Sequence, residues 1–166
     1  MPTLSNTILA CATLTTALMA GLFYAYSCSV NPGLNRLPDT AYLMAMQSIN
    51  KAIQNPVFFV SFLGTPILLL YSTWLHYGSP VTARFWLLVG ATLVYLIGAL
   101  GVTVLGNIPL NNGLDAFSIQ TASLEEIAAQ RQKFEGPWGS WHLIRTIASI
   151  STLILLILAC LNRESD

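Results

Sequence analysis

Formal charge is scarce in this chain of 166 residues. Asp, Glu, Lys and Arg make up 8% of it, whereas soluble domains average about 25%, and the formal net charge is zero. No basic run is long enough to follow a phosphate backbone, so we expect no nucleic acid partner. Apolar residues make up 54% of the chain, more than so short a chain can bury in a water-facing fold. A soluble domain is therefore excluded.

Metal-ligand spacing is also lacking. The three cysteines, Cys11, Cys28 and Cys160, are far apart, and two of them lie in apolar segments where a thiol behaves as a small hydrophobe. We therefore expect no metal site and no structural disulfide. The sequence shows no evident flavin motif, and we expect no cofactor. The N-terminus has no basic region, so the apolar run 7–30 is interpreted as a retained first helix rather than a signal peptide.

Four long stretches without a formally charged side chain dominate the chain. They cover residues 1–35, 52–83, 85–114 and 146–162. About 20 apolar helical residues cross the hydrocarbon core of a bilayer, and the fourth helix must begin near Gly139 to be long enough. We predict an all-α fold, a bundle of four transmembrane helices forming one integral membrane domain over 1–166. The expected helices are about 5–30, 56–76, 81–105 and 139–161.

Proline and glycine mark the expected helix ends. Helix one should stop at Asn31-Pro32-Gly33 and helix three at Gly106-Asn107-Ile108-Pro109, with a turn at Gly78-Ser79-Pro80 between helices two and three. Pro66 lies inside helix two and predicts a kink whose freed backbone group a neighbouring helix must satisfy. Glycines in helix three, at 90, 98 and 101, favour close helix contact.

Two further helices are expected in the long connections. Over 39–55 the apolar residues recur at helical spacing, which predicts an amphipathic helix on or just under the membrane surface. Ser123 and Glu126 form a capping-box pattern that starts a short helix to Phe134, closed by Gly136-Pro137. These connections carry most of the basic residues, Arg36, Lys51, Arg131 and Lys133, whereas the opposite side has Arg84 and Arg163. The positive-inside rule then places the long connections in the cytoplasm, with the protein in the bacterial inner membrane.

Polar and aromatic residues gather at the start of helix four. Trp138, Trp141, His142, Arg145 and Ser149 have the spacing of one helical face. A cation and an imidazole beside two indoles can orient an aromatic, partly anionic ligand. The alternative is a membrane anchor, because tryptophan belts and snorkelling arginines are ordinary at helix ends.

Neutral polar residues are expected at the same end of the bundle. Helix one shows Gly21, Tyr24, Ser27, Cys28 and Asn31 at three-and-four spacing, and helix three ends near Asn107, Asn111 and Asn112. Such side chains can hold a carbonyl or a phenol, although Asn31 and Asn107 could equally cap helix ends. No ionisable residue falls near mid-membrane, which disfavours an ion or proton pump.

Several motifs, in order along nearly the whole chain, carry a family resemblance. They are Tyr24-Ala25-Tyr26-Ser27 leading to Asn31-Pro32-Gly33-Leu34, Met46-Gln47-Ser48-Ile49-Asn50, Gly106-Asn107-Ile108-Pro109-Leu110-Asn111, and the Trp-rich start of the last helix ending in Arg145-Thr146. Together they resemble the anthrone oxygenase-like family of small integral membrane proteins, whose fungal members are implicated in oxidising polyketide anthrones to anthraquinones. One departure is His142, where many relatives are expected to carry Asn.

The resemblance implies a cofactor-independent monooxygenase for a lipophilic, anthrone-like or hydroquinone-like substrate. His142 would be the base that removes a methylene proton, and Arg145 would stabilise the resulting anion. Asn31 and Asn107 would hold the carbonyl, and further binding candidates are Tyr24, Ser27, Gln47, Asn50, Asn111, Trp138 and Trp141. The alternative is a non-enzymatic membrane protein that binds a quinone-like molecule, or a structural subunit, because one fold hosts many functions.

Overall fold

A computed structural model describes residues 3–78 and 80–162, and within these ranges the ordered elements are all helical. Four helices of the described part are long and apolar enough to cross a membrane, and they are Leu4–Leu34, Pro56–Leu75, Ala83–Asp115 and Leu124–Leu161. The predicted four-helix membrane bundle is confirmed, and the chain is a multi-pass membrane protein. Arg163, used in the orientation prediction, lies outside the described residues, as does Ser79 of the predicted turn.

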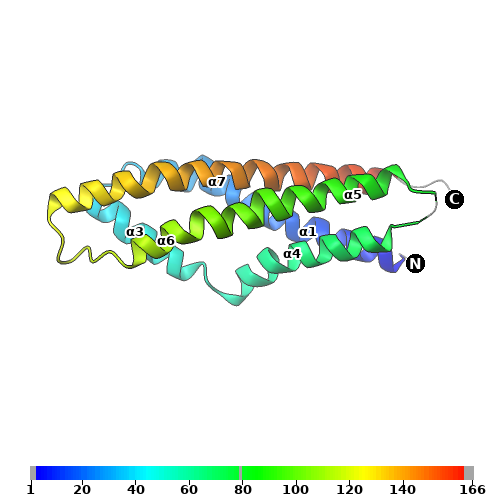
Figure 1. The fold of residues 1–166 in the computed structure, drawn as a ribbon, viewed down its shortest axis with the longest axis horizontal. Coiled ribbons are helices and arrows are strands. Elements are labelled where there is room, and N and C mark those ends of the chain that lie inside the picture. Colours follow the sequence, from blue (N-terminus) through cyan, green and yellow to red (C-terminus); the bar gives the residue numbers. More distant parts are fainter. Residues whose placement is uncertain (1–2, 79, 163–166) are drawn as a thin grey trace.

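The four spanning helices differ in length, and this difference divides the molecule. Helix α4 (Pro56–Leu75) has 20 residues, which at about 1.5 Å each matches a hydrocarbon core. The other three have 31, 33 and 38 residues and run on past the start of α4. Their continuation, with α3 (Asp39–Ala52), forms the half of the molecule opposite the two termini (Figure 1). We call this half the extension.

The first helix does not end at its proline. It consists of α1 (Leu4–Ala25), the π-helical segment η1 (Tyr26–Val30) and α2 (Asn31–Leu34). Pro32 lies in the first turn of α2, where a missing N–H is tolerated, and the Asn31 N–H bonds five residues back to the Tyr26 carbonyl. The predicted end near residue 30 was therefore wrong by four residues, and the helix ends at Leu34, directly after the predicted Asn31-Pro32-Gly33 stop, because a wider helical turn accommodates the proline.

The third spanning helix repeats this solution. It runs through α5 (Ala83–Val94), the π-helical segments η2 (Tyr95–Gly101) and η3 (Thr103–Asn107), and α6 (Ile108–Asp115). Pro109 lies in the first turn of α6, and the Ile108 N–H bonds five residues back to the Thr103 carbonyl. The predicted end near residue 105 was also wrong, for the same reason.

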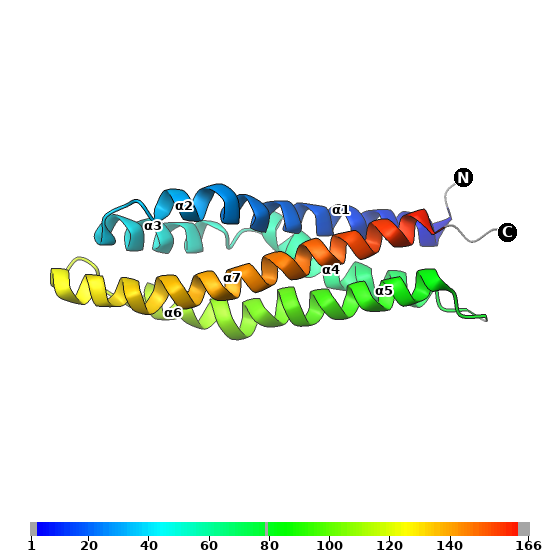
Figure 2. The ribbon, with the colours of Figure 1, turned by 90° about the horizontal axis from the view of Figure 1, so that it is seen from above.

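The fourth spanning helix is a single element, α7 (Leu124–Leu161), of 38 residues. Its capping box forms as predicted, with both Ser123 and Glu126 bonds present. The predicted break at Gly136-Pro137 is absent from this described helix. Both residues lie on its exposed side, where water can bond the carbonyl that Pro137 leaves free, while Phe134 stays buried against α3. In Figure 2, α7 runs between α1 and α5.

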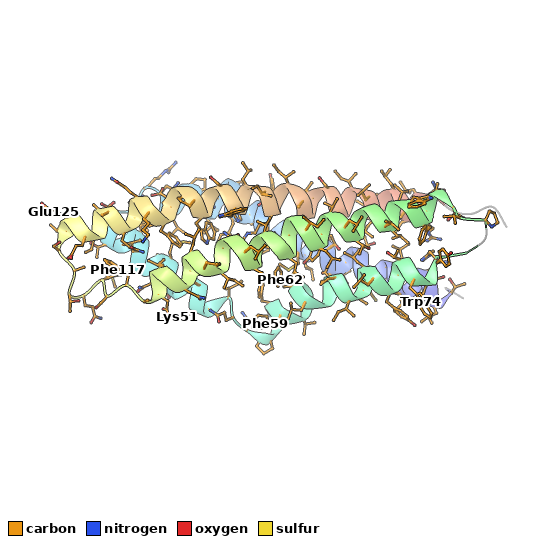
Figure 3. All side chains as sticks on the ribbon, in the orientation of Figure 1. Lys51, Phe59, Phe62, Trp74, Phe117 and Glu125 are labelled. Carbon is orange, nitrogen blue, oxygen red and sulfur yellow. The ribbon has the colours of Figure 1, made fainter. Side chains whose placement is uncertain are left out.

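Pro66 shows how the bundle satisfies a freed backbone group. It lies inside α4, and its missing N–H leaves the carbonyl of Phe62 without a helical partner. The hydroxyl of buried Tyr95 donates to that carbonyl at 3.2 Å. The partner predicted from a neighbouring helix is therefore present. Figure 3 shows Phe62 on α4 and Trp74 near the far end of the same helix.

In the extension, α3 packs its apolar face on α7 and α6. Tyr42, Leu43 and Met46 are buried in one cluster with Phe134 and Trp138 of α7. Arg131 of α7 fixes the start of α3 by bonding Asp39 at 2.9 Å and the Leu37 carbonyl at 2.7 Å. The predicted amphipathic helix is thus a packed layer of the bundle, and its place relative to the membrane surface stays a prediction.

Candidate functional site

A cavity of about 200 Å³ lies where the extension meets the membrane-spanning half. It is enclosed by the ends of α1 and α3, the start of α4, the η3–α6 segment and α7. Its aromatic residues are Phe23, Tyr26, Phe58, Phe59 and Phe62, and its polar residues are Asn50, Gln54, Thr103, Asn111, Asn112 and Arg145. Figure 3 shows Phe59 near the bend between α3 and α4, at this level. The cavity lies beside the first residues of α4.

One wall of the cavity is aromatic. Phe58 and Phe62 are one turn apart on α4, and their rings stack with centroids 5.1 Å apart and planes within 13°. Phe59 adds a third ring, 42% exposed at the rim. An aromatic ligand can stack on, or meet edge to face, the rings of this wall.

Arg145 is the cation of the cavity. Its guanidinium lies 4.5 Å above the Phe23 ring and 5.1 Å above the Trp138 ring. Among the described residues it forms no salt bridge, and no Asp or Glu lines the cavity. A cation held among rings without a carboxylate costs several kcal/mol, about the effective desolvation penalty of a buried ion. A ligand with negative charge on oxygen would supply the missing partner.

His142 lies behind Arg145 and is 2% exposed. Its Nε2 atom is 3.0 Å from the Ser27 hydroxyl, and its ring stacks on Trp138 with centroids 5.1 Å apart and planes within 7°. Arg145 donates to its Nδ1 atom from Nε at 3.2 Å. His142 is not itself a lining residue, so Arg145 stands between the cavity and the imidazole.

The asparagines of the third spanning helix hold Trp138 in place. Asn111 accepts from the indole N–H at 2.8 Å, and Asn107 donates to the Trp138 carbonyl at 3.3 Å. Asn111 also lines the cavity, whereas Asn107 is fully buried and its Oδ1 has no partner within the described part of the chain. These contacts fix the ring on which both His142 and Arg145 rest.

The two candidates from α3 have different roles. Asn50 lines the cavity, and its buried Nδ2 has no hydrogen-bond partner among residues 3–78 and 80–162. Gln47 instead donates to the carbonyls of Leu114 and Phe117, at 2.8 and 3.0 Å. Asn50 is therefore available to a ligand, while Gln47 ties α3 to the end of α6.

Three predicted candidates lie away from the cavity. Tyr24 is 59% exposed, and Asn31 is partly buried but does not line the cavity. Trp141 is 38% exposed and packs on Gly106, where an added Cβ would come within 2.5 Å of the indole. Trp141 therefore packs on the third spanning helix, as Trp138 does, but it is more exposed than Trp138 or His142 and does not line the cavity.

Sequence reasoning missed the aromatic residues that do line the cavity. From α1 and η1 these are Phe23 and Tyr26, and from α4 they are Phe58 and Phe62. The three-and-four spacing from Gly21 selected Tyr24, which is 59% exposed, and passed over its buried neighbour Phe23. Phe58 and Phe62 were visible as an i, i+4 aromatic pair, but such pairs are also common at membrane boundaries.

Metal ligands do not cluster in the described chain, which has no group of three His, Cys, Asp or Glu placed to hold an ion. Its three cysteines are free thiols.

Comparison with known proteins bears on the same region. A family model described as anthrone oxygenase matches residues 53–155. This range includes the Phe58–Phe62 wall, the η3–α6 asparagines, His142 and Arg145. No curated protein and no solved structure matches the chain. Since the family model covers more than half of the sequence, the chain belongs to the anthrone oxygenase family.

Proposed function

We propose that the protein binds a flat, lipophilic aromatic ketone or phenol in this cavity and oxidises it with dioxygen. The observation that carries the proposal is Arg145, a cation without a carboxylate on the wall of an aromatic cavity. Membership of the anthrone oxygenase family supports an anthrone-like or hydroquinone-like substrate. The position beside the first residues of a membrane-spanning helix suits a molecule that partitions into lipid.

Binding would use the contacts that the cavity leaves open. The rings of the ligand would stack on the Phe58–Phe62 wall, and its most negative oxygen would accept from Arg145. The Asn50 amide, buried and without a partner among the described residues, would bond a second polar group. In this proposal Asn50 takes the carbonyl-holding role that the sequence suggested for Asn31.

The chemistry needs no reductant beyond the substrate. Removing a proton from the acidic methylene of an anthrone gives an enolate, which adds to dioxygen and forms a carbon–oxygen bond. The hydroperoxide then loses the second methylene proton as its O–O bond breaks, leaving a carbonyl and releasing water. One anthrone and one dioxygen thus give one anthraquinone and one water, and all four electrons come from the substrate carbon.

Each proposed role follows from position. Arg145 would stabilise the enolate and the peroxide anion, because a preorganised cation acts most strongly in a water-poor site. His142 is the proposed base, since it is the histidine within hydrogen-bond distance of Arg145. Trp138, held by Asn107 and Asn111, would keep both side chains in place.

The test is oxygen uptake by the protein in lipid nanodiscs supplied with emodin anthrone. We expect uptake above autoxidation for the wild type and uptake at the autoxidation rate for His142→Ala, with both proteins melting cooperatively. Full activity in a folded His142→Ala protein would eliminate the base, and no excess uptake by the wild type would eliminate the oxygenase.

One observation favours a second candidate, a binding protein without chemistry. Arg145 donates hydrogen bonds to Nδ1 of His142, and the imidazole does not line the cavity. The proposed base therefore has no lone pair that a ligand can reach in this structure. Under this reading emodin would bind saturably, His142→Ala would bind it equally well, and no oxygen would be consumed beyond autoxidation.

Orientation is also a proposal. The extension carries Arg36, Lys51, Arg131 and Lys133, and the positive-inside rule would place it in the cytoplasm of a bacterial inner membrane. A cysteine introduced at exposed Gln120, in a variant lacking the native cysteines, should react with an impermeant maleimide only after the cells are opened. Labelling of intact cells would reverse the orientation.

A further inference from the structure

Hydrogen-bond directions around His142 fix its tautomer. A guanidinium can only donate, and both Nε and Nη2 of Arg145 lie near Nδ1, at 3.2 and 3.1 Å. Nδ1 must therefore carry the lone pair and accept. The ring proton is then on Nε2, which donates to the Ser27 hydroxyl at 3.0 Å, and Ser27 in turn donates to the Phe23 carbonyl at 3.1 Å.

This arrangement describes a neutral imidazole whose only lone pair is covered. A protonated ring would turn an N–H toward the guanidinium, donor against donor and cation against cation. Apart from Arg145, the titratable group that faces the ring is the Tyr26 phenol, with ring centroids 6.0 Å apart. No carboxylate among the described residues bonds His142. His142 cannot accept a proton from a ligand while Arg145 donates to its Nδ1.

Arg145 lines the cavity, and its guanidinium donates a hydrogen bond to His142. We propose that a ligand oxygen draws Arg145 away from Nδ1, so that the lone pair of His142 opens only when the cavity is occupied. A hydrogen bond from the guanidinium to a negative oxygen is stronger than one to a neutral imidazole. This difference favours movement of the guanidinium from His142 to the ligand. The same movement polarises the ligand carbonyl and makes its methylene more acidic.

Ser27 is a positioning residue in this scheme. By accepting from Nε2–H, it keeps the proton on that nitrogen and leaves Nδ1 basic. The π-helical segment η1 contains Ser27, and this segment is where the first helix departs from regular spacing. The inference rests on the proposed function, because it names how the base of that reaction is exposed.

The second histidine supplies an internal control. Nδ1 of His76 lies 2.8 Å from the Ser72 carbonyl, and a carbonyl can only accept. His76 must therefore carry its proton on Nδ1, the opposite tautomer from His142. The chain has two histidines, so one spectrum reports on both.

The experiment is nitrogen NMR of the full chain in nanodiscs with ¹⁵N-labelled histidine. We expect one ring with an unprotonated Nδ1 and one with an unprotonated Nε2, and His76→Gln should remove only the second. Saturation with emodin, which cannot be oxidised further at this carbon, should shift the Nδ1 signal of His142 and leave His76 unchanged. A protonated Nδ1 on His142, or an Nδ1 signal that does not move when bound emodin saturates the protein, would overturn the inference.

Kinetics separate positioning from mere packing. Ser27→Ala should mix the two tautomers of His142 in the emodin-saturated protein, where Arg145 no longer donates to Nδ1, and lower kcat for emodin anthrone with KM unchanged, while Ser27→Thr should restore both. A Ser27→Ala protein with the wild-type tautomer and kcat would refute the positioning role. The wild-type tautomers are read without ligand. Absence of oxygen uptake would therefore refute the proposed function without affecting the tautomer assignment.

Discussion

Arg145 and Arg131 lie on the same helix but differ in what surrounds their charge. Arg145 bonds one imidazole nitrogen and stacks on two rings, and no carboxylate among the described residues pairs with it. Arg131 bonds Glu135 at 2.7 Å, Asp39 at 2.9 Å and two carbonyls, and it stacks on Tyr42. Replacing each by Met should therefore affect stability and ligand binding in opposite ways.

The expected magnitudes follow from these contacts. Arg145→Met loses a charge-assisted bond of about 1.5–3 kcal/mol and cation–π contacts of about 1–2 kcal/mol. It also removes a desolvation penalty of several kcal/mol, so the free energy of unfolding should change by no more than about 1–2 kcal/mol. Arg131→Met leaves Asp39 and Glu135, which are 45% and 30% exposed, without their cation and two carbonyls without their donor, and should cost about 1–3 kcal/mol.

For ligand binding we expect the larger effect from Arg145→Met and the smaller one from Arg131→Met. Losing the guanidinium should weaken emodin binding by about 10- to 100-fold, the equivalent of one charge-assisted hydrogen bond. Arg131→Met should bind emodin as the wild type does, because Arg131 does not line the cavity. Thermal unfolding in detergent and quenching of tryptophan fluorescence by emodin measure the two quantities. A large stability loss in Arg145→Met with unchanged affinity would show that Arg145 is structural and refute the reasoning.

Three other predictions concern the fold. Tyr95→Phe should lower the free energy of unfolding by about 1–3 kcal/mol, because it leaves a carbonyl unpaired, and Pro66→Ala should offset this loss by supplying an N–H. Gly98→Ala should cost about 1–3 kcal/mol, since its Cβ would lie 2.5 Å from a side chain of α7, whereas Gly64→Ala, with open space, should be neutral or stabilising. Burial and the nearby Glu135 raise the pKa of Tyr42 to about 12, above its usual value of 10.0. The folded state therefore keeps the Tyr42 proton to higher pH than the unfolded chain does, so the free energy of unfolding should fall as pH rises from 10 to 12. Thermal melts across this pH range should show a weaker fall for Tyr42→Phe.

The sequence predicted the fold class well because lipid imposes a simple constraint. Runs without charge can be read directly, and the capping box at Ser123 acts within one turn, so both were predictable. The helix ends were not. Pro32 and Pro109 normally end helices, but each follows a π-helical turn that absorbs it, and Pro137 is tolerated on the exposed side of α7.

The site was predicted in part for a related reason. Arg145, Asn50 and Asn111 line the cavity as binding candidates should, because regular spacing holds on their helices. Tyr24 was chosen because it lies three residues from both Gly21 and Ser27, and this spacing does not identify Tyr26. The separation of His142 from the cavity by Arg145 depends on rotamers, which a pattern of residue types does not specify.

The most direct test of the central claim is saturable oxygen uptake with emodin anthrone by Arg145→Met and by its matched control Arg131→Met, each in nanodiscs and corrected for autoxidation. We expect Arg131→Met to retain the wild-type rate per folded protein and Arg145→Met to fall to the autoxidation rate while remaining folded. Equal, saturable uptake by both variants would contradict it, because the cation on the cavity wall would then have no part in the reaction.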